Sequence, residues 1–120
     1  MNPLLHEGEY VFCPLEGNIN IDISHVLGSF KEEEGITIVV EKRVADEMKL
    51  TYSFVSSWIT LQVHSSLEAV GLTAAFSKAL SDAGISCNVI AAFYHDHIFV
   101  DRKDSGKAME ILTALSESNI

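Results

Sequence analysis

The chain has 120 residues, of which 8 are Lys or Arg and 17 are Asp or Glu, and its formal net charge is −9 at pH 7. This length fits one globular unit that buries roughly two thirds of its unfolded surface. Nucleic acids and anionic membrane surfaces attract clustered Lys and Arg, and here the few basic residues are scattered. We therefore expect no nucleic-acid partner and no membrane partner.

Two features predict a cytoplasmic location. Met1–Tyr10 lacks the basic start and apolar centre of a signal peptide, and the longest apolar run, near Ser86–Phe93, is far shorter than the ~20 residues that span a bilayer. Cys13 and Cys87 lie in separate strand-like segments without CxxC spacing. Two buried, reduced thiols are therefore expected rather than a disulfide or a metal pair.

The first half of the chain is predicted to contain strands, a short helix and a long connection. Strands are expected over Glu9–Cys13 and Gly35–Glu41, where apolar and branched residues gather. Asn18–Glu34 mixes Gly, Asn and acidic residues, which predicts a loop with a short strand or a turn of helix. An amphipathic helix over Lys42–Leu50 and a further strand over Thr51–Ser57 complete this half.

The second half begins with a strand and a helix. Residues Trp58–His64 alternate between apolar and polar side chains after Trp58, which is typical of a half-buried strand. Apolar residues then recur at helical spacing, which predicts a helix over Glu68–Ala83. Gly84 follows, and glycine commonly ends a helix in a left-handed conformation.

A hairpin and a final helix follow. Ile85–Tyr94 and Ile98–Asp101 are rich in branched and aromatic residues, and the polar pair His95–Asp96 separates them. Asp104 or Ser105 can cap the last helix, which carries one apolar stripe. The second half therefore has the order strand, helix, strand, strand, helix.

This order predicts an α+β fold of the ferredoxin-like βαββαβ type, with an antiparallel sheet that carries its helices on one face. The final strand is missing from the second half, and Glu9–Cys13 and Gly35–Glu41 are candidates to supply it. The segments Gly35–Met48 and His97–Met109 share a strand, a charged joint and a helix, which indicates a weak internal repeat.

The stretch Leu67–Ile90 resembles an ACT domain of the aspartate-kinase type, a small-molecule-sensing module of amino-acid metabolic enzymes. The resemblance clearly covers Trp58–Leu115, about half of the chain. It rests on a glycine that opens the first helix, on apolar residues in that helix, and on the turn and strand that follow. These residues are Gly71, Phe76, Leu80, Ala83, Gly84, Ile85 and Asn88.

The first half, with Tyr10–Phe12 and Glu33–Thr37, resembles stand-alone ACT proteins in which a shortened ACT-like ββαβ unit precedes a full one. We therefore expect a shortened unit over residues 1–57 and an ACT domain over residues 58–120, joined in one continuous globular unit. The catalytic domain of the larger relatives has no counterpart in this sequence.

A ligand site is expected where a strand end meets a helix start, at Ser65–Gly71. Unpaired N–H groups and the helix dipole there favour a carboxylate, and Gly71 lets a ligand approach closely, although it also fits helix–sheet packing. Asn88 offers a donor and an acceptor, and the resemblance implies that it contacts the ligand, with a turn-stabilising role as the alternative. Hydroxyls near a helix start also serve as caps. The predicted ligand-binding residues are Ser65, Ser66, Leu67, Glu68, Ala69, Val70, Gly71, Leu72 and Asn88.

The resemblance implies a non-catalytic regulatory protein that binds an amino acid at an ACT–ACT interface. A homodimer is expected, with a metabolic enzyme or a regulator as a further partner, and no cofactor. The sequence has no GxSxG motif and no glycine-rich phosphate loop, so we do not expect an enzyme.

Two alternatives remain open. The alternating strand Trp58–His64 and the pair Phe93–Tyr94 are also consistent with a protein-interaction module that binds no small ligand.

The second alternative is a metal site at the predicted hairpin. His95 and His97 are two residues apart on a strand, so they share a face, and Asp96 or His64 could add a ligand. The hairpin turn could instead leave both imidazoles exposed. The other histidines, His6 and His25, are assigned no role.

Overall fold

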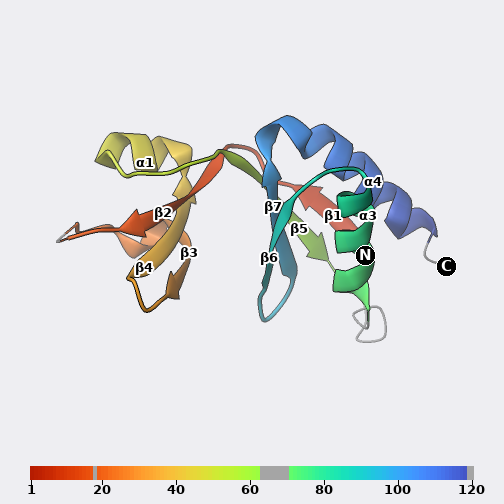
Figure 1. Cartoon of the computed structure of the whole chain (residues 1–120), viewed down its shortest axis with the longest axis horizontal. Coiled ribbons are helices and arrows are strands. Elements are labelled where there is room, and N and C mark those ends of the chain that lie inside the picture. Colours follow the sequence, from red (N-terminus) through yellow and green to blue (C-terminus); the bar gives the residue numbers. More distant parts are fainter. Residues whose placement is uncertain (18, 63–70, 119–120) are drawn as a thin grey trace. The chain divides into compact units, whose positions relative to one another are not determined.

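The computed structural model describes residues 1–17, 19–62 and 71–118, and the chain divides into two compact units. The N-terminal unit is Gly8–Ser56, and the C-terminal unit combines Met1–Glu7 with Ser57–Ile120. Figure 1 labels the elements of both units. None of the helices among the described residues is long and apolar enough to span a membrane.

The N-terminal unit is built on three antiparallel strands. Their order is β3-β4-β2, with β2 at Tyr10–Leu15, β3 at Val26–Lys31 and β4 at Ile36–Glu41. The connection between β2 and β3 contains a short 3-10 helix, η1 (Ile23–His25). The predicted loop with a short strand or a turn of helix therefore contains both elements.

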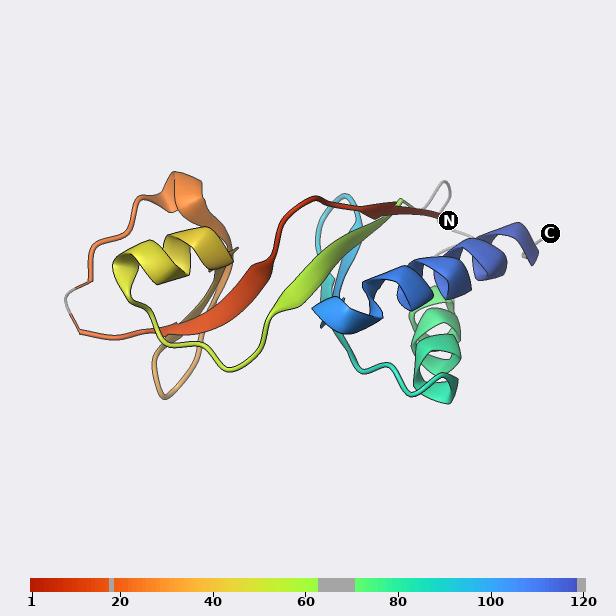
Figure 2. The same cartoon turned by 90° about the horizontal axis from the view of Figure 1, so that it is seen from above.

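The helix α1 (Lys42–Met48) covers one face of this small sheet. Figure 2 shows α1 lying across the strands. Alternating side chains of β2 and β4 point toward it because successive residues of a strand face opposite sides. The buried members of this core are Val11, Cys13, Ile38, Val40, Val44, Ala45 and Leu50.

The predicted strand over Thr51–Ser57 is wrong for most of its length. Residues 50–55 form no strand, and β5 begins only at Ser56 and runs to Gln62. A single pair, Tyr10 with Ser56, joins β2 to β5. Most of this segment thus lacks the ladder of hydrogen bonds that defines a strand.

The C-terminal unit confirms the predicted α+β order. After β5 come the helix α3 (Leu72–Asp82), the strands β6 (Cys87–Ala91) and β7 (Asp96–Asp101), and the helix α4 (Ser105–Ser118). The strands lie in the order β5-β7-β6. Figure 2 shows both helices on one side of this sheet.

The strand that the second half lacks comes from the start of the chain. β1 (Asn2–Leu5) pairs antiparallel with β5, from Asn2 opposite Gln62 to Leu5 opposite Ile59. The candidates Glu9–Cys13 and Gly35–Glu41 are wrong for this position, because they form β2 and β4 of the N-terminal unit. The sequence is too short and irregular at Met1–Leu5 to predict a strand.

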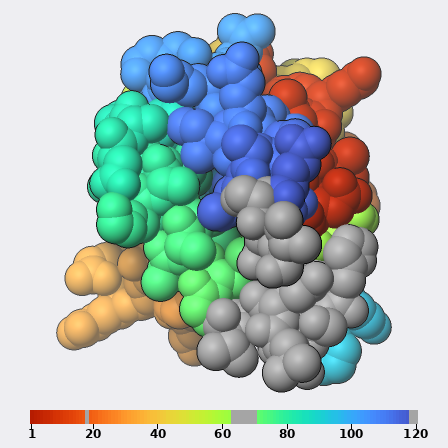
Figure 3. All heavy atoms as spheres, turned by 90° about the vertical axis from the view of Figure 1, so that its right-hand side faces the viewer, coloured from red at the N-terminus to blue at the C-terminus, as the bar shows by residue number. Residues whose placement is uncertain are grey.

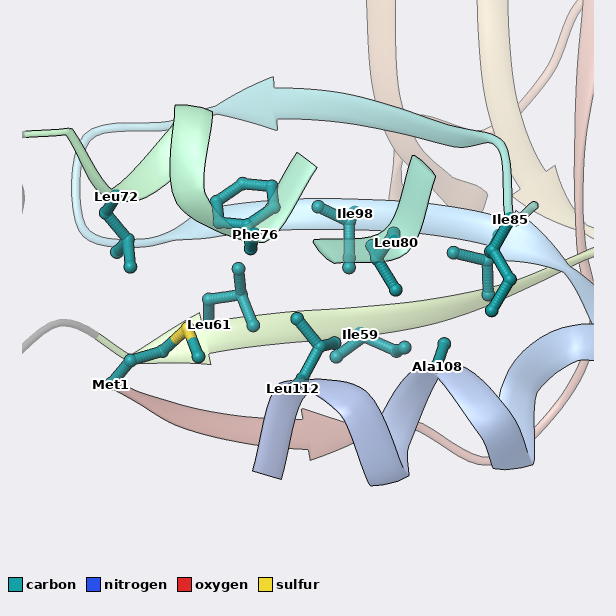
Figure 4. Packing of buried hydrophobic residues seen from close by; sticks show 11 residues of the cluster. Met1, Ile59, Leu61, Leu72, Phe76, Leu80, Ile85, Ile98, Ala108 and Leu112 are labelled. Atoms are coloured by element: carbon teal, nitrogen blue, oxygen red, sulfur yellow. The ribbon is translucent and has the colours of Figure 1, made fainter. Parts of the chain in front are cut away.

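The core of the C-terminal unit lies between this four-stranded sheet and the two helices (Figure 4). The side chain of Met1 is buried in it, and the Ser116 hydroxyl donates a hydrogen bond to the Met1 carbonyl. Figure 3 shows the N-terminal residues beside α4 on the surface of this unit. The buried members are Met1, Ile59, Leu61, Leu72, Phe76, Leu80, Ile85, Ile98, Val100, Ala108 and Leu112.

The hairpin differs from its predicted boundaries. β6 ends at Ala91, and the Ala92 N–H donates to the His95 carbonyl at 3.0 Å to close the turn. β7 already begins at Asp96, so His97 lies within the strand. The exposed aromatic residues that extended the predicted strand to Tyr94 belong to the turn.

The internal repeat is visible in the structure. β4 leads directly into α1, and β7 leads into α4 through a short 3-10 helix, η2 (Arg102–Asp104). Ala45 and Ala108 occupy matching places in the two helices, and both have 0% exposure. Each small side chain lets its helix approach the sheet closely, since a larger one would have no space in a packed core.

Candidate functional site

The start of α3 offers backbone N–H groups to an anion. Gly71 precedes the helix with φ 75°, a left-handed conformation that favours glycine, and it provides no side-chain cap. Among the described residues, and apart from the neighbours of Gly71 in the chain and the backbone of α3, no atom lies within 4 Å of the position that a Cβ would take there. The first turn contains no acidic residue, so the positive end of the helix dipole is not neutralised within α3.

Only the backbone of Leu72 can take part in such a site. Its side chain is 6% exposed and packs in the core with Phe76 and Leu80. The other predicted residues of this loop, Ser65, Ser66, Leu67, Glu68, Ala69 and Val70, lie outside the described residues.

Asn88 lies on the other side of the sheet. It is exposed on β6 and pairs with Phe99 of β7. Its neighbours Cys87 and Val89 pack against the core beneath the helices. Because side chains alternate along a strand, Asn88 points to the face opposite α3, which we call the open face. One unit therefore does not bring Asn88 and the start of α3 together.

The open face also carries a network of polar side chains from β5, from β7 and from the residue that follows β1. Trp58 of β5 donates its indole N–H to Nδ1 of His97 of β7 at 3.1 Å. The Thr60 hydroxyl lies 3.0 Å from the same nitrogen and 2.7 Å from Nε2 of His6. The rings of His6 and Trp58 are stacked, with centroids 3.5 Å apart and planes 13° from parallel.

The network fixes the protonation state of His97. An indole N–H can only donate, so Nδ1 of His97 accepts and carries no proton, and the neutral ring holds its proton on Nε2. Burial lowers the pKa of His97, His95 lowers it further, and Asp96 partly opposes this. Burial also lowers the pKa of His6, with a smaller contribution from His97.

The hairpin does not present His95 and His97 as an exposed pair. Both imidazoles are half-buried, which corrects the alternative that leaves them in solvent, and their rings lie 6.4 Å apart and nearly perpendicular. Nδ1 of His95 is buried without a hydrogen-bond partner among the described residues. Within the described ranges, no three ligating side chains lie together to hold a metal, and His64 lies outside them. We assign neither imidazole as a metal ligand.

Sequence reasoning missed His6 and the role of the polar face of β5. The alternation after Trp58 predicts that Thr60 lies on the face opposite Ile59 and Leu61, which is correct. His6 joins Thr60 only because β1 pairs with β5, and its backbone N–H donates to the Trp58 carbonyl at 2.9 Å. No local pattern in the first six residues indicates this register.

The fold defined by these elements is a ferredoxin-like α+β module of the kind that regulatory domains use. Two ACT domain profiles match the chain, one over residues 1–57 and one over residues 53–114. The chain therefore belongs to the ACT domain family, whose members are regulatory modules that bind small ligands.

Solved structures agree with this assignment. Protein VC0802 of Vibrio cholerae, described as of unknown function and a possible transport protein, has a TM-score of 0.81 and 49% identity, covering 92% of this chain and 85% of that chain. Protein Atu0741 of Agrobacterium tumefaciens has a TM-score of 0.72 and 19% identity, covering 93% and 86%.

A third structure, described as a possible C-terminal regulatory domain of aspartate kinase from Porphyromonas gingivalis, has a TM-score of 0.61 and 15% identity, covering 94% of both chains. At these low identities, the second and third structures support the fold alone. No curated protein matches the chain significantly.

Proposed function

We propose that this chain is a non-catalytic regulatory protein that binds an amino acid at an interface between two ACT units. The observation that carries the proposal is the start of α3, where no described residue fills the space beside Gly71 and Gly71 itself gives the backbone N–H groups no side-chain cap. A carboxylate satisfies such groups and interacts favourably with the helix dipole.

The two halves of the proposed site come from different copies. The carboxylate would lie at the start of α3, together with the predicted loop at Ser65–Val70, and Asn88 of a neighbouring copy would hold the amino group. Asn88 points away from the helices of its own unit, so one unit cannot supply both halves. This supports a homodimer whose packing the ligand stabilises.

The setting that fits this role is the cytoplasm. Cys13 and Cys87 are both free, as is usual in a reducing compartment. The protein would act by changing its assembly or its contacts with a metabolic enzyme or a regulator.

Thermal unfolding with each common amino acid at millimolar concentration tests the proposal. A ligand at ~100 times its dissociation constant adds ~2.7 kcal/mol to the folded state. For a chain of this size, that free energy raises the midpoint by roughly 10 °C. A saturable shift with one amino acid supports the proposal, whereas no shift with any of them contradicts it.

Two variants test the two halves of the site separately. Thr73→Asp places a carboxylate in the first turn of α3, where it favours the free helix but repels a ligand carboxylate. It should therefore weaken binding without lowering the unfolding midpoint of the free protein. Ser81→Asp adds the same charge near the other end of α3 and serves as the matched control. Asn88→Ala should weaken binding by about 1–3 kcal/mol, since it removes a hydrogen bond to a charged group.

A second candidate function rests on the turn between β6 and β7. Phe93 is 91% exposed and Tyr94 is 81% exposed, and the two rings contact each other edge to face. Exposed aromatic side chains of this kind anchor protein partners. If no amino acid shifts the unfolding midpoint, loss of partner binding in Phe93→Ser would favour an interaction module.

A further inference from the structure

Strand β1 is attached to its unit by backbone pairing, by the buried side chain of Met1 and by contacts of His6 just beyond its end. Its backbone pairs with β5 over four residues, and Leu4 and Leu5 are 47% and 40% exposed, so little apolar burial secures its middle. Beyond Leu5, the His6 side chain stacks on Trp58 and contacts Thr60. These side chains in turn contact His97 on β7.

We propose that His6, Trp58, Thr60 and His97 form a pH-sensitive latch that holds β1 on the sheet when both imidazoles are neutral and loosens it when His97 is protonated. The proposal does not depend on the amino-acid site at α3. All four side chains belong to the C-terminal unit.

The geometry identifies His97 as the residue that senses the proton. A proton on its Nδ1 would point at the indole N–H of Trp58, 3.1 Å away, and two donors would then face each other. The Thr60 hydroxyl, which can donate or accept, would then accept from Nδ1 instead of donating to it. One protonation event therefore breaks the Trp58 contact between β5 and β7 and reverses the direction of the Thr60 contact.

His6 responds differently. Thr60 has one hydroxyl proton and lies between two imidazole nitrogens, so it can donate to one and accept from the other. While His97 stays neutral, a protonated Nε2 of His6 can donate to the Thr60 hydroxyl, which in turn donates to Nδ1 of His97. With both rings charged, like charges would face each other across Thr60, and β1 would carry one of them away from the sheet when it opens.

The charged groups around His97 have opposing effects on its protonation. His95, in the turn before β7, opposes protonation of His97, and Asp96, the first residue of β7, favours it. β5 presents only uncharged groups among its described residues. The groups on and beside the four strands are His6 and Glu7 just after β1, Trp58, Thr60 and Gln62 on β5, Asn88 and Ile90 on β6, His95 just before β7, and Asp96 and His97 on β7.

Hydrogen exchange of the full chain between pH 8.0 and pH 5.5 measures the attachment of β1. This range lies above the isoelectric point of about 4.8. After correction for the intrinsic exchange rates, the opening equilibrium of β1 should rise by up to about tenfold per pH unit for each proton taken up on opening. Amides of β4 in the N-terminal unit serve as the internal reference and should not change in this way.

Trp58 is the only tryptophan, so its fluorescence reports the latch directly. The signal should titrate with a midpoint below 6.5, the ordinary value for histidine, together with the exchange of β1. His97→Asn keeps an acceptor oxygen near the position of Nδ1 but cannot titrate, so both pH effects should disappear while β1 stays protected. His25→Asn removes an exposed histidine of the N-terminal unit and should leave both effects in place.

Two results would overturn the proposal. One is an unchanged pH dependence of β1 exchange in His97→Asn. The other requires no variant: nitrogen NMR of the natural protein at pH 7.5 should show His97 protonated on Nε2 only, and a proton on Nδ1 would contradict the latch.

Discussion

The indole N–H of Trp58 and Nδ1 of His97 lie 3.1 Å apart, and this hydrogen bond links β5 to β7 on the open face of the sheet. The partner of Trp58 is a titratable acceptor in a half-buried position. The bond exists only while His97 is neutral, because a protonated Nδ1 cannot accept. Protein stability should therefore depend on pH through this pair.

We predict that the free energy of unfolding falls as the pH is lowered from 7.5 to 5.5. The pKa values of His6 and His97 are lowered in the folded protein, so the unfolded chain binds protons first, at about its ordinary pKa of 6.5. The stabilisation is complete above 6.5 and is lost as the pH falls toward the folded pKa values. The slope is at most about 1.4 kcal/mol per pH unit for each imidazole, and smaller here because both rings are part-exposed.

Urea unfolding at a series of pH values measures this slope. Asp22 and Asp46 have pKa values below their ordinary 3.8, so the stability that they contribute is lost only in more acidic solution. The variant with both His6→Gln and His97→Asn should show a flatter profile over the same range. A natural protein with constant stability from pH 7.5 to 5.5 would contradict the prediction.

The hydroxyl of Ser56 should stabilise the N-terminal unit. Ser56 has 0% exposure, and its Oγ donates to the Tyr10 carbonyl at 2.8 Å, next to the one backbone pair that joins β2 to β5. Ser56→Ala removes this hydrogen bond and should cost about 0.5–1.5 kcal/mol in chemical denaturation. Ser29→Ala changes an exposed serine of β3 and should stay within about 0.5 kcal/mol of the natural protein. Equal effects of the two substitutions would show that the buried bond is not stabilising.

Leu112 should be among the most sensitive positions of the C-terminal unit. Its side chain is fully buried between α4 and the sheet, in one cluster with Met1 and Leu61 (Figure 4). Leu112→Ala removes apolar contacts and leaves a cavity, so it should cost about 2–5 kcal/mol by thermal or urea unfolding. Ile23→Ala, at a side chain that is 84% exposed, should change stability by less than about 0.5 kcal/mol. A small loss at Leu112 would mean that α4 can collapse into the space.

Local patterns were sufficient to predict most elements of this fold. The alternation that places Ile59 and Leu61 on one face and Thr60 on the other is correct, because a strand repeats every two residues. Helical spacing likewise predicts the buried face of α3, where Phe76 and Leu80 are fully buried. Such patterns are set by residues close together in the sequence, so they indicate the buried face of a strand or helix before its partners in the fold are known.

Relationships between distant residues could not be predicted in the same way. The pairing of Leu5 with Ile59 joins residues far apart in sequence, and four residues of β1 carry too little pattern to set a register. The network around His97 depends on that register, so His6 had no visible role. For the ligand site, sequence and resemblance indicated Gly71 and Asn88. Only the structure shows that Asn88 lies on the face of the sheet opposite α3, because its neighbours Cys87 and Val89 face the core.

Both α1 and α3 are followed by a residue in the left-handed backbone conformation, but only one of these residues is glycine. Lys49 follows α1 with φ 57°, and Gly84 follows α3 with φ 75°. A side chain is strained in this conformation by roughly 1–2 kcal/mol, whereas glycine is not, although glycine loses more entropy on folding. Among the described residues other than its chain neighbours, no atom lies within 4 Å of a Cβ placed at Gly84. Gly84→Ala should therefore lose about 1 kcal/mol through the backbone alone, and Gly84→Asn should lose less.

Introducing glycine at the end of α1 should stabilise the protein, in contrast to the loss expected from removing glycine after α3. Lys49→Gly relieves the strain at the end of α1 and should raise the free energy of unfolding by up to about 1 kcal/mol, after the entropy cost of glycine is subtracted. The N–H of Lys49 donates to the Asp46 carbonyl at 3.2 Å, and glycine retains that bond. Urea unfolding of Gly84→Ala, Gly84→Asn and Lys49→Gly under one condition measures the expected losses and the expected gain in the free energy of unfolding. If Lys49→Gly destabilises the protein while Gly84→Ala has no effect, backbone strain does not control the two helix ends.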